Sequence, residues 1–202
     1  PGAYAMMDAL FQEMKDCARE RNLPILRDSE LPLFTGIMAS CRPSRVLEIG
    51  TCIGYSALQM APFLASGGTI TTIELDTERY DLACQFFRRS PYASVITALH
   101  GDGTELAGTL PGPWDFVFLD GPKGQYVRQL RQLVPKLLPG AIVAADNIDY
   151  HDMFYLEGTL PHKHRTAVTR LREFMDLVGD RSRFETVFFE NGDGMTVSQW
   201  KG

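Results

Sequence analysis

The chain has 202 residues, of which 45% are hydrophobic and 22% are charged, so its composition is that of an ordinary soluble protein with enough apolar material for a core. Its net charge of -5 argues against a generic nucleic-acid binder, which is usually basic, although a local basic patch stays open. No apolar run approaches the roughly 18 residues that a membrane span needs. The scattered cysteines form no Cys-x-x-Cys pair, a pattern typical of reduced thiols in a cytoplasmic protein.

The N-terminal residues 1–40 are expected to be helical. Apolar residues recur at helical spacing over residues 4–21, and Pro24 and Pro32 interrupt the chain before a short helix over residues 34–40. The first helix should mainly pack against the rest of the protein. A lid over a functional site is the alternative.

From residue 45 onward, segments with strand character alternate with segments of helical periodicity. The expected strands cover residues 45–49, 69–73, 94–99, 115–119 and 141–145. The expected helices cover residues 55–65, 78–89, 126–137 and 166–178. Such alternation predicts an α/β fold with a mostly parallel sheet and helices on both faces.

The C-terminal segment departs from this alternation. Residues 184–189 and 195–199 should be strands, and the link Asn191-Gly192-Asp193-Gly194 between them is typical of an antiparallel hairpin. We therefore predict one domain over residues 1–202, with residues 1–40 packing on or covering its site.

A glycine-containing loop follows the first expected strand. Ligands of open parallel sheets bind at the carboxyl ends of the strands, and Gly50 and Gly54 let the backbone turn tightly and approach a ligand there. The spacing is G-x-x-x-G, whereas dinucleotide folds use G-x-G-x-x-G. Glu48 would be badly placed beside a pyrophosphate but would suit a cofactor with a cationic amino group. A strand-to-helix turn that simply needs glycine is the alternative.

Two further acids follow the second and third expected strands. Glu74 stands 24 positions after Gly50, where a carboxylate can accept hydrogen bonds from both hydroxyls of a ribose. Asp102, between two glycines, lies where an adenine edge would be, which is a weak signal alone. Structural acids also occur at strand ends, but an acid and an earlier glycine loop together are less common by chance. The pattern indicates a cofactor that contains a nucleoside.

Oxygen-bearing side chains end the fourth and fifth expected strands. Asp120 follows one of them, and Asp146 and Asn147 follow its neighbour, so the three should meet at one sheet edge. Two carboxylates and an amide suit Mg²⁺, Mn²⁺ or Ca²⁺ rather than zinc. The alternative is that Asp120 caps the next helix and that Asp146 and Asn147 only form a turn.

Lys123 stands just before the helix that follows Asp120. The positive end of a helix and a neighbouring divalent ion would both make its ammonium easier to deprotonate, which suits a group that accepts a proton. The alternative is an exposed surface lysine, as most lysines are.

These residues resemble the metal-dependent class I O-methyltransferases, the group that includes catechol and caffeoyl-CoA O-methyltransferases. The resemblance is carried by V-L-E-I-G-T-C-I-G-Y-S-A at 46–57, T-I-E-L-D at 72–76, F-L-D-G-P-K-G-Q-Y at 118–126 and A-D-N at 145–147. It implies a Rossmann-like seven-stranded sheet whose last strand is antiparallel. Because bacterial members are often dimers, it also implies a homodimer.

The resemblance also implies roles for individual residues. S-adenosylmethionine would be held by Glu48, Gly50, Ser56, Glu74, Asp102 and Asp120. Magnesium, or manganese or calcium in its place, would be held by Asp120, Asp146 and Asn147. Lys123 would be the catalytic base for the acceptor hydroxyl.

Other segments resemble a bacterial branch that methylates 5-hydroxyuridine in tRNA. They are Leu23-Pro24-Ile25-Leu26, Arg165-Thr166 and Gly192-Asp193-Gly194. Gly121-Pro122 and Asp149 depart from the group beside the acceptor site, so they bear on the substrate. We predict an O-methyltransferase for a small catechol-like acceptor, with tRNA 5-hydroxyuridine as the alternative.

A tRNA acceptor would need phosphate contacts from basic residues. Residues 162–165, with Arg170 and Arg172 on the following helix, are the best candidates, and a solvated helix face is the alternative. Two rival functions are a nicotinamide-dependent oxidoreductase and a non-enzymatic RNA-binding or scaffold module. The G-x-x-x-G spacing counts against the first, and the full set of presumed metal ligands and base counts against the second.

Overall fold

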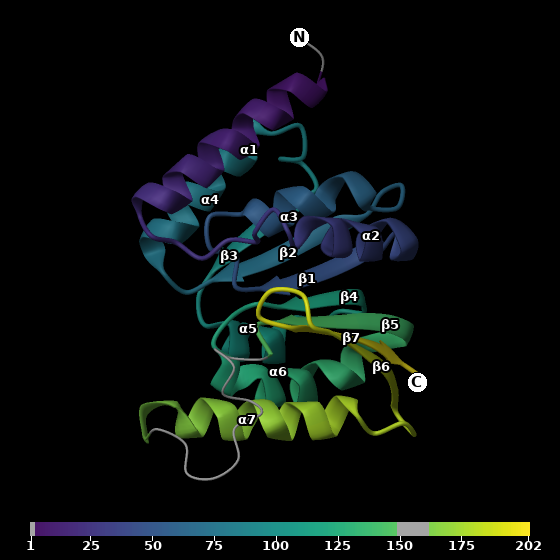
Figure 1. The fold of residues 1–202 in the computed structure, drawn as a ribbon. Coiled ribbons are helices and arrows are strands. Elements are labelled where there is room, and N and C mark those ends of the chain that lie inside the picture. The colour runs from purple at the N-terminus through teal and green to yellow at the C-terminus, as the bar shows by residue number, and fades with distance from the viewer. Residues whose placement is uncertain (1–2, 149–161) are drawn as a thin grey trace.

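A seven-stranded sheet runs through the computed structural model, which describes residues 3–148 and 162–202, and helices cover both of its faces (Figure 1). The strands are β1 (Arg45–Ile49), β2 (Thr69–Glu74), β3 (Ile96–His100), β4 (Trp114–Leu119), β5 (Leu137–Asp146), β6 (Phe184–Phe189) and β7 (Met195–Trp200). Their order in the sheet is β3-β2-β1-β4-β5-β7-β6. The strands from β3 to β5 pair in parallel, and β7 runs antiparallel to both β5 and β6. The predicted fold class and terminal hairpin are confirmed.

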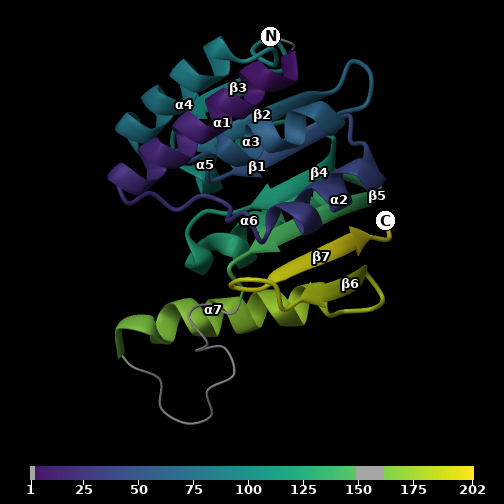
Figure 2. The same cartoon turned by 45° about the horizontal axis from the view of Figure 1, so that its top comes forward.

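The helices form one layer on each face of the sheet. One layer contains α1 (Ala3–Glu20), α2 (Leu31–Cys41), α3 (Tyr55–Met60) and α4 (Thr77–Arg89), and the other contains α5 (Gly103–Thr109), α6 (Tyr126–Leu133) and α7 (His162–Val178) (Figures 1 and 2). Short 3-10 turns cover Ala61–Phe63, Lys123–Gln125 and Val134–Lys136.

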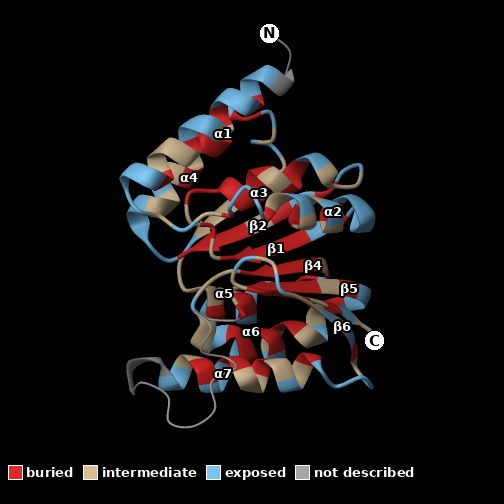
Figure 3. Cartoon of the chain, viewed as in Figure 1, coloured by how far each residue is buried: buried red, intermediate tan, exposed pale blue. Residues whose placement is uncertain are grey.

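The central strand β4 divides the core between the two faces. Phe116 and Phe118 point into the cluster under α1–α4, whereas Val117 and Leu119 point into the cluster under α5–α7. This alternation follows from the two-residue period of a strand, and a strand covered on both faces must be apolar at every one of these positions. The central strands β1 and β4 are accordingly buried along almost their whole length (Figure 3).

The N-terminal helix α1 packs along α4 (Figure 2). Its buried side chains include Met7, Leu10 and Met14, which belong to the same cluster as α2 and α3. The ring of Phe11 meets that of Tyr55 edge-on, with centroids 5.5 Å apart. An ion pair between Glu13 and Arg89 joins α1 to α4, and another joins Arg21, just after α1, to Glu78. In the described part of the chain, every helix is too short or too polar to cross a membrane.

Several predicted boundaries were wrong for identifiable reasons. Pro32 does not delay α2, because a proline is tolerated in the first turn of a helix, where its missing N–H has no partner to lose. Pro135 ends α6 at Leu133, well before the predicted end at 137, because it cannot donate within the helix. The chain then enters β5 at Leu137, earlier than expected.

Helix α5 was not predicted. Asp102 begins it as an N-cap, with its Oδ1 accepting hydrogen bonds from Thr104 N at 2.8 Å and Glu105 N at 3.0 Å. The helix covers only residues 103–109, which is too short for a clear apolar period.

Candidate functional site

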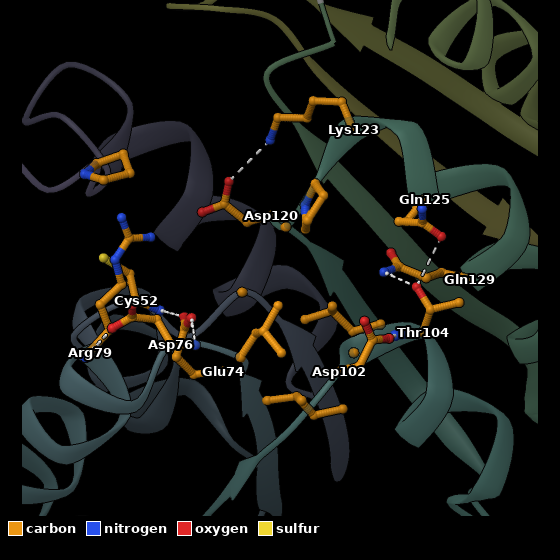
Figure 4. A pocket seen from close by; sticks show the side chains of 18 of the residues that line it. Cys52, Glu74, Asp76, Arg79, Asp102, Thr104, Asp120, Lys123, Gln125 and Gln129 are labelled. Carbon is orange, nitrogen blue, oxygen red and sulfur yellow. Dashed lines mark hydrogen bonds and ion pairs between the residues drawn. The ribbon is translucent and has the colours of Figure 1, made fainter. Parts of the chain in front are cut away.

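A cleft of about 750 Å³ opens at the carboxyl ends of β1, β2, β3 and β4 (Figure 4). The predicted site residues that line it are Gly50, Glu74, Asp102, Asp120, Lys123 and Asn147. They lie at or just after the carboxyl ends of the five neighbouring strands β1 to β5, so the parallel sheet brings them together. Glu48, Ser56 and Asp146 do not line this cleft.

The glycine loop needs its two glycines for conformational and packing reasons. Gly50 has φ +103°, and a Cβ there would lie 2.4 Å from the carbonyl oxygen of Asp120. Gly54 has φ +89° at the start of α3, and a Cβ there would meet the ring of Phe87 at 2.5 Å. These constraints alone explain both glycines, so they do not distinguish a cofactor loop from an ordinary turn.

Glu48 and Ser56 lie together beneath the glycine loop. Glu48 is fully buried, and its carboxylate accepts hydrogen bonds from the hydroxyls of Ser56 and Thr72, the latter at 2.7 Å. Burial raises the pKa of Glu48 to about 8. Both residues therefore support the loop from behind, and their contact with a cofactor stays a prediction.

Glu74 is held rigidly at the edge of the cleft. Its Oε2 accepts a hydrogen bond from Cys52 N at 2.7 Å, and its Oε1 accepts one from Asp76 N at 2.9 Å. Each carboxylate oxygen keeps further acceptor capacity. The side chain can therefore accept hydrogen bonds from two neighbouring hydroxyls. Arg79 lines the cleft on the same side (Figure 4).

Asp102 has a structural role and still faces the cleft. Its Oδ1 caps α5, as described above, and its side chain lies beside Thr104 on the opposite side of the cleft from Glu74 (Figure 4). Capping accounts for one of its two oxygens. The other is available to a ligand, so a cofactor contact stays a prediction.

Asp120, Asp146 and Asn147 meet at the ends of β4 and β5. Asn147 Nδ2 donates to Asp120 Oδ1 at 3.2 Å, and Asn147 N donates to Asp146 Oδ1 at 2.8 Å. Neither the following 3-10 turn nor α6 begins with a side-chain capping bond, so Asp120 does not cap the next helix. Whether Asp146 and Asn147 only form a turn stays open. Among the described residues, no three His, Cys, Asp or Glu side chains form a metal-holding group. The predicted set has only two carboxylates, with the amide as its third ligand.

The pKa values of both carboxylates in this set are raised. Burial, and then the neighbouring Asp120, raise the pKa of Asp146 to about 7. Burial also raises the pKa of Asp120, although the Lys123 ammonium, 3.6 Å from its Oδ1, opposes that shift. A bound cation would stabilise both charged forms. The donor set therefore fits a hard divalent ion.

Lys123 is held in place by a residue that the sequence analysis did not single out. Its Nζ donates to the hydroxyl of Tyr126 at 2.8 Å, and that buried hydroxyl lies 2.9 Å from Leu119 O and 3.0 Å from Asp146 O. The Lys123 side chain is only 15% exposed, so it is not a surface lysine. A tyrosine three positions after the lysine, in the first turn of the next helix, was the available signal.

A second cavity, of about 470 Å³, adjoins the first. It shares Pro24, Asp120 and Asn147 with the cleft, and it is also lined by Asp146 and by Glu30, the residue before α2. Side chains of α1 line it as well, so this helix both packs against the core and borders the site. Asp120 and Asn147 therefore face both spaces, and Asp146 faces the second.

A model of the O-methyltransferase family matches residues 15–201. The chain belongs to the O-methyltransferase family. It is 27% identical over 174 residues to a caffeoyl-CoA O-methyltransferase of Stellaria longipes, covering 81% of this chain and 71% of that protein. It is 26% identical over 169 residues to a catechol O-methyltransferase of Niastella koreensis, covering 78% of this chain and 74% of that protein.

Solved structures share the fold of this family member. An O-methyltransferase from Bacillus cereus, in complex with SAH, superposes with a TM-score of 0.85 at 20% identity, covering 96% of this chain and 91% of that one. The O-methyltransferase TomG from Streptomyces achromogenes, in complex with SAM, gives a TM-score of 0.84 at 22% identity, covering 96% and 90%.

Proposed function

We propose that this family member transfers a methyl group from S-adenosylmethionine to a hydroxyl that neighbours a second oxygen, as in a catechol, with the help of a divalent metal. The observation that carries the proposal is one cleft with Glu74 on one side and the pair of Asp120 and Lys123 on the other (Figure 4). The names of the caffeoyl-CoA and catechol relatives support the acceptor class, and the SAM and SAH complexes support the cofactor.

The cofactor end of the cleft suits a nucleoside. The ribose hydroxyls would donate to Glu74, whose backbone hydrogen bonds fix its two oxygens before the ligand arrives. Asp102 on the facing wall would contact the adenine edge. The methionine part would then extend past Gly50 toward Asp120, along the remaining lining of the same cleft.

The metal would be held by Asp120, Asp146 and Asn147. When bound, a divalent ion supplies positive charge that favours the deprotonated form of the acceptor hydroxyl. Asp120 and Asp146 contribute the compensating negative charge, and their burial strengthens this electrostatic interaction.

In its neutral amine form, Lys123 would accept the proton of the acceptor hydroxyl on its Nζ, which Tyr126 holds at the cleft, and would become an ammonium. The acceptor oxygen then forms a bond to the methyl carbon while the bond between that carbon and the sulfonium sulfur breaks. The products are a methyl ether and S-adenosylhomocysteine. The chain's contribution is mainly the position of the two reactants and the charge around them.

A transfer assay with labelled S-adenosylmethionine tests the proposal. We expect labelling of catechols, whereas tRNA whose 5-hydroxyuridine is not yet methylated should stay unlabelled. Labelled tRNA together with unlabelled catechols would establish the alternative.

The basic residues proposed for tRNA contacts are only partly described. The side chains at 162–164 lie outside the described residues, as does Asp149. In the described part, Arg170 pairs with Glu173 at 2.8 Å, and Arg165 and Arg172 also have interaction partners. The expected homodimer stays a prediction.

A further inference from the structure

Glu30 is a buried carboxylate that the proposed reaction leaves without a role. It is only 7% exposed, and its Oε2 accepts a hydrogen bond from Arg27 N at 2.7 Å. It occupies the N-cap position of α2, yet its side chain makes no capping bond to that helix. The carboxylate is therefore directed away from the helix that it precedes.

The β6–β7 loop fixes the other side of this carboxylate. A Cβ at Gly192 would lie 2.2 Å from Glu30 Oε1, so only a glycine lets the loop come this close. Asn191 Nδ2 donates to Ser29 O at 3.1 Å, and Arg27 pairs with Asp193 at 2.5 Å. Segments from the two ends of the chain thus hold Glu30 in one position.

Glu30 lines the second cavity together with Asp120 and Asp146. Its charge contributes to raising the pKa of both aspartates. None of the ion pairs found in the described part of the chain includes Glu30. A buried carboxylate without a cation is costly unless hydrogen-bond donors satisfy it. One backbone N–H is a small part of what its two oxygens can accept.

Glu30 also stands apart from the direct metal ligands, since no group of three acidic, His or Cys side chains in the described residues could hold an ion. The cavity between it and Asp120 is also lined by Lys15, Arg19 and Arg27, but no ion pair joins any of them to Glu30 in the described part of the chain. Whatever fills that cavity can therefore supply a donor to its free acceptor positions. Under the proposed function, that occupant is the methyl acceptor.

On the basis of that proposed function, we propose that Glu30 is a positioning residue whose carboxylate accepts a hydrogen bond from the acceptor hydroxyl that is not methylated. A carboxylate attracts a second hydroxyl and repels a carbonyl oxygen, because only the hydroxyl can donate. Glu30 therefore selects a pair of adjacent hydroxyls over a hydroxyl beside a carbonyl, such as O4 of a 5-hydroxypyrimidine.

Glu30→Gln is the variant that isolates this charge. Its amide oxygen can still accept from Arg27 N, while its amide N–H can donate to a carbonyl. Binding of catechol and of 5-hydroxyuracil would be measured by calorimetry with the protein saturated with S-adenosylhomocysteine and Mg²⁺. The catechol preference is the ratio of the dissociation constant of 5-hydroxyuracil to that of catechol. We expect the wild-type chain to bind catechol more tightly than 5-hydroxyuracil, and Glu30→Gln to lower this ratio by roughly tenfold.

The matched control is Glu185→Gln, an exposed glutamate on β6 that pairs with Lys201, and it should leave the preference unchanged. The role of Glu30 is overturned if Glu30→Gln keeps the wild-type preference, or if the variant loses affinity for Mg²⁺ and not its preference for catechol. If the variant does not fold, the wild-type comparison decides, because tighter binding of 5-hydroxyuracil contradicts the inference. If the wild-type chain methylates catechol but Glu30→Gln keeps the same preference, only this inference is refuted. If the wild-type chain neither methylates nor binds catechol, the proposed function is refuted as well.

Discussion

The ammonium of Lys123 lies 2.8 Å from the hydroxyl of Tyr126, a fully buried side chain in the first turn of α6. The same hydroxyl reaches the backbone at Leu119 and Asp146, at the ends of β4 and β5. Tyr126 therefore connects the proposed base to the two strands that carry the oxygen cluster. Burial keeps its hydroxyl protonated, since it raises the pKa of Tyr126 well above the usual value.

Tyr126→Phe should release Lys123 without changing its charge. We expect kcat to fall by roughly tenfold because the base loses its fixed position. The free energy of unfolding should fall by about 1–3 kcal/mol because buried carbonyls lose a donor. Rate measurements and urea titrations check both effects, with Tyr92→Phe, which lines neither of the two cavities, as the control. An unchanged kcat would show that the tyrosine is only structural.

Glu74→Gln tests the cofactor end of the cleft. The glutamine amide keeps one acceptor oxygen, whereas the glutamate carboxylate has two. We therefore expect S-adenosylmethionine to bind between one and two orders of magnitude more weakly, a loss of roughly 2–3 kcal/mol of binding free energy. Calorimetry on the folded variant gives the dissociation constant directly. The exposed Glu78, also changed to Gln, serves as the control. Equal affinities in wild type and Glu74→Gln would remove Glu74 from the cofactor site.

Asp146→Asn tests the oxygen cluster. We expect the affinity for Mn²⁺ to fall at least roughly tenfold, because one of two carboxylates is lost, while S-adenosylmethionine still binds. Manganese binding can be followed by electron paramagnetic resonance in the absence of substrate. Asp176→Asn, on the exposed side of α7, is the matched control. Equal Mn²⁺ affinity in the wild type and in Asp146→Asn would show that Asp146 does not hold the ion.

Glu48 should make stability depend on pH. Its pKa is raised from 4.5 to about 8 by burial, so the folded state binds this proton more tightly than the unfolded state does. The resulting contribution to stability is fully present below about pH 4.5 and is lost as the pH rises through about 8.

Glu48→Gln should therefore flatten the pH dependence of stability between these limits. It should be more stable than the wild type near pH 8. Urea unfolding without cofactor, repeated across that range, measures the difference between the two proteins. Parallel curves would mean that Glu48 titrates normally in the folded state.

The sheet could be predicted because strands with mainly apolar or β-branched residues alternate with segments that keep a helical period. Phe116 through Leu119 must be apolar to be covered on both faces, and that requirement is visible in the sequence. Gly50, Glu74 and Asp120 could be placed at one edge because parallel strands end together.

Contacts between distant segments could not be predicted in this way. Glu30 and Gly192 lie on different segments with no shared period, so only tertiary packing brings them together. The second cavity exists for the same reason, since α1 closes one of its sides. Tyr126 reads in the sequence as an ordinary core residue, and its partners become apparent only when β4 and β5 are in place.

The most direct test of metal-dependent methyl transfer is the rate at which the purified chain converts catechol and S-adenosylmethionine to the monomethyl ether, measured with excess EDTA and then with Mg²⁺ restored. We expect no product in EDTA and full recovery with the ion, because Asp120, Asp146 and Asn147 would need it to favour the deprotonated hydroxyl. Undiminished formation of the ether in EDTA would contradict the metal-dependent reaction.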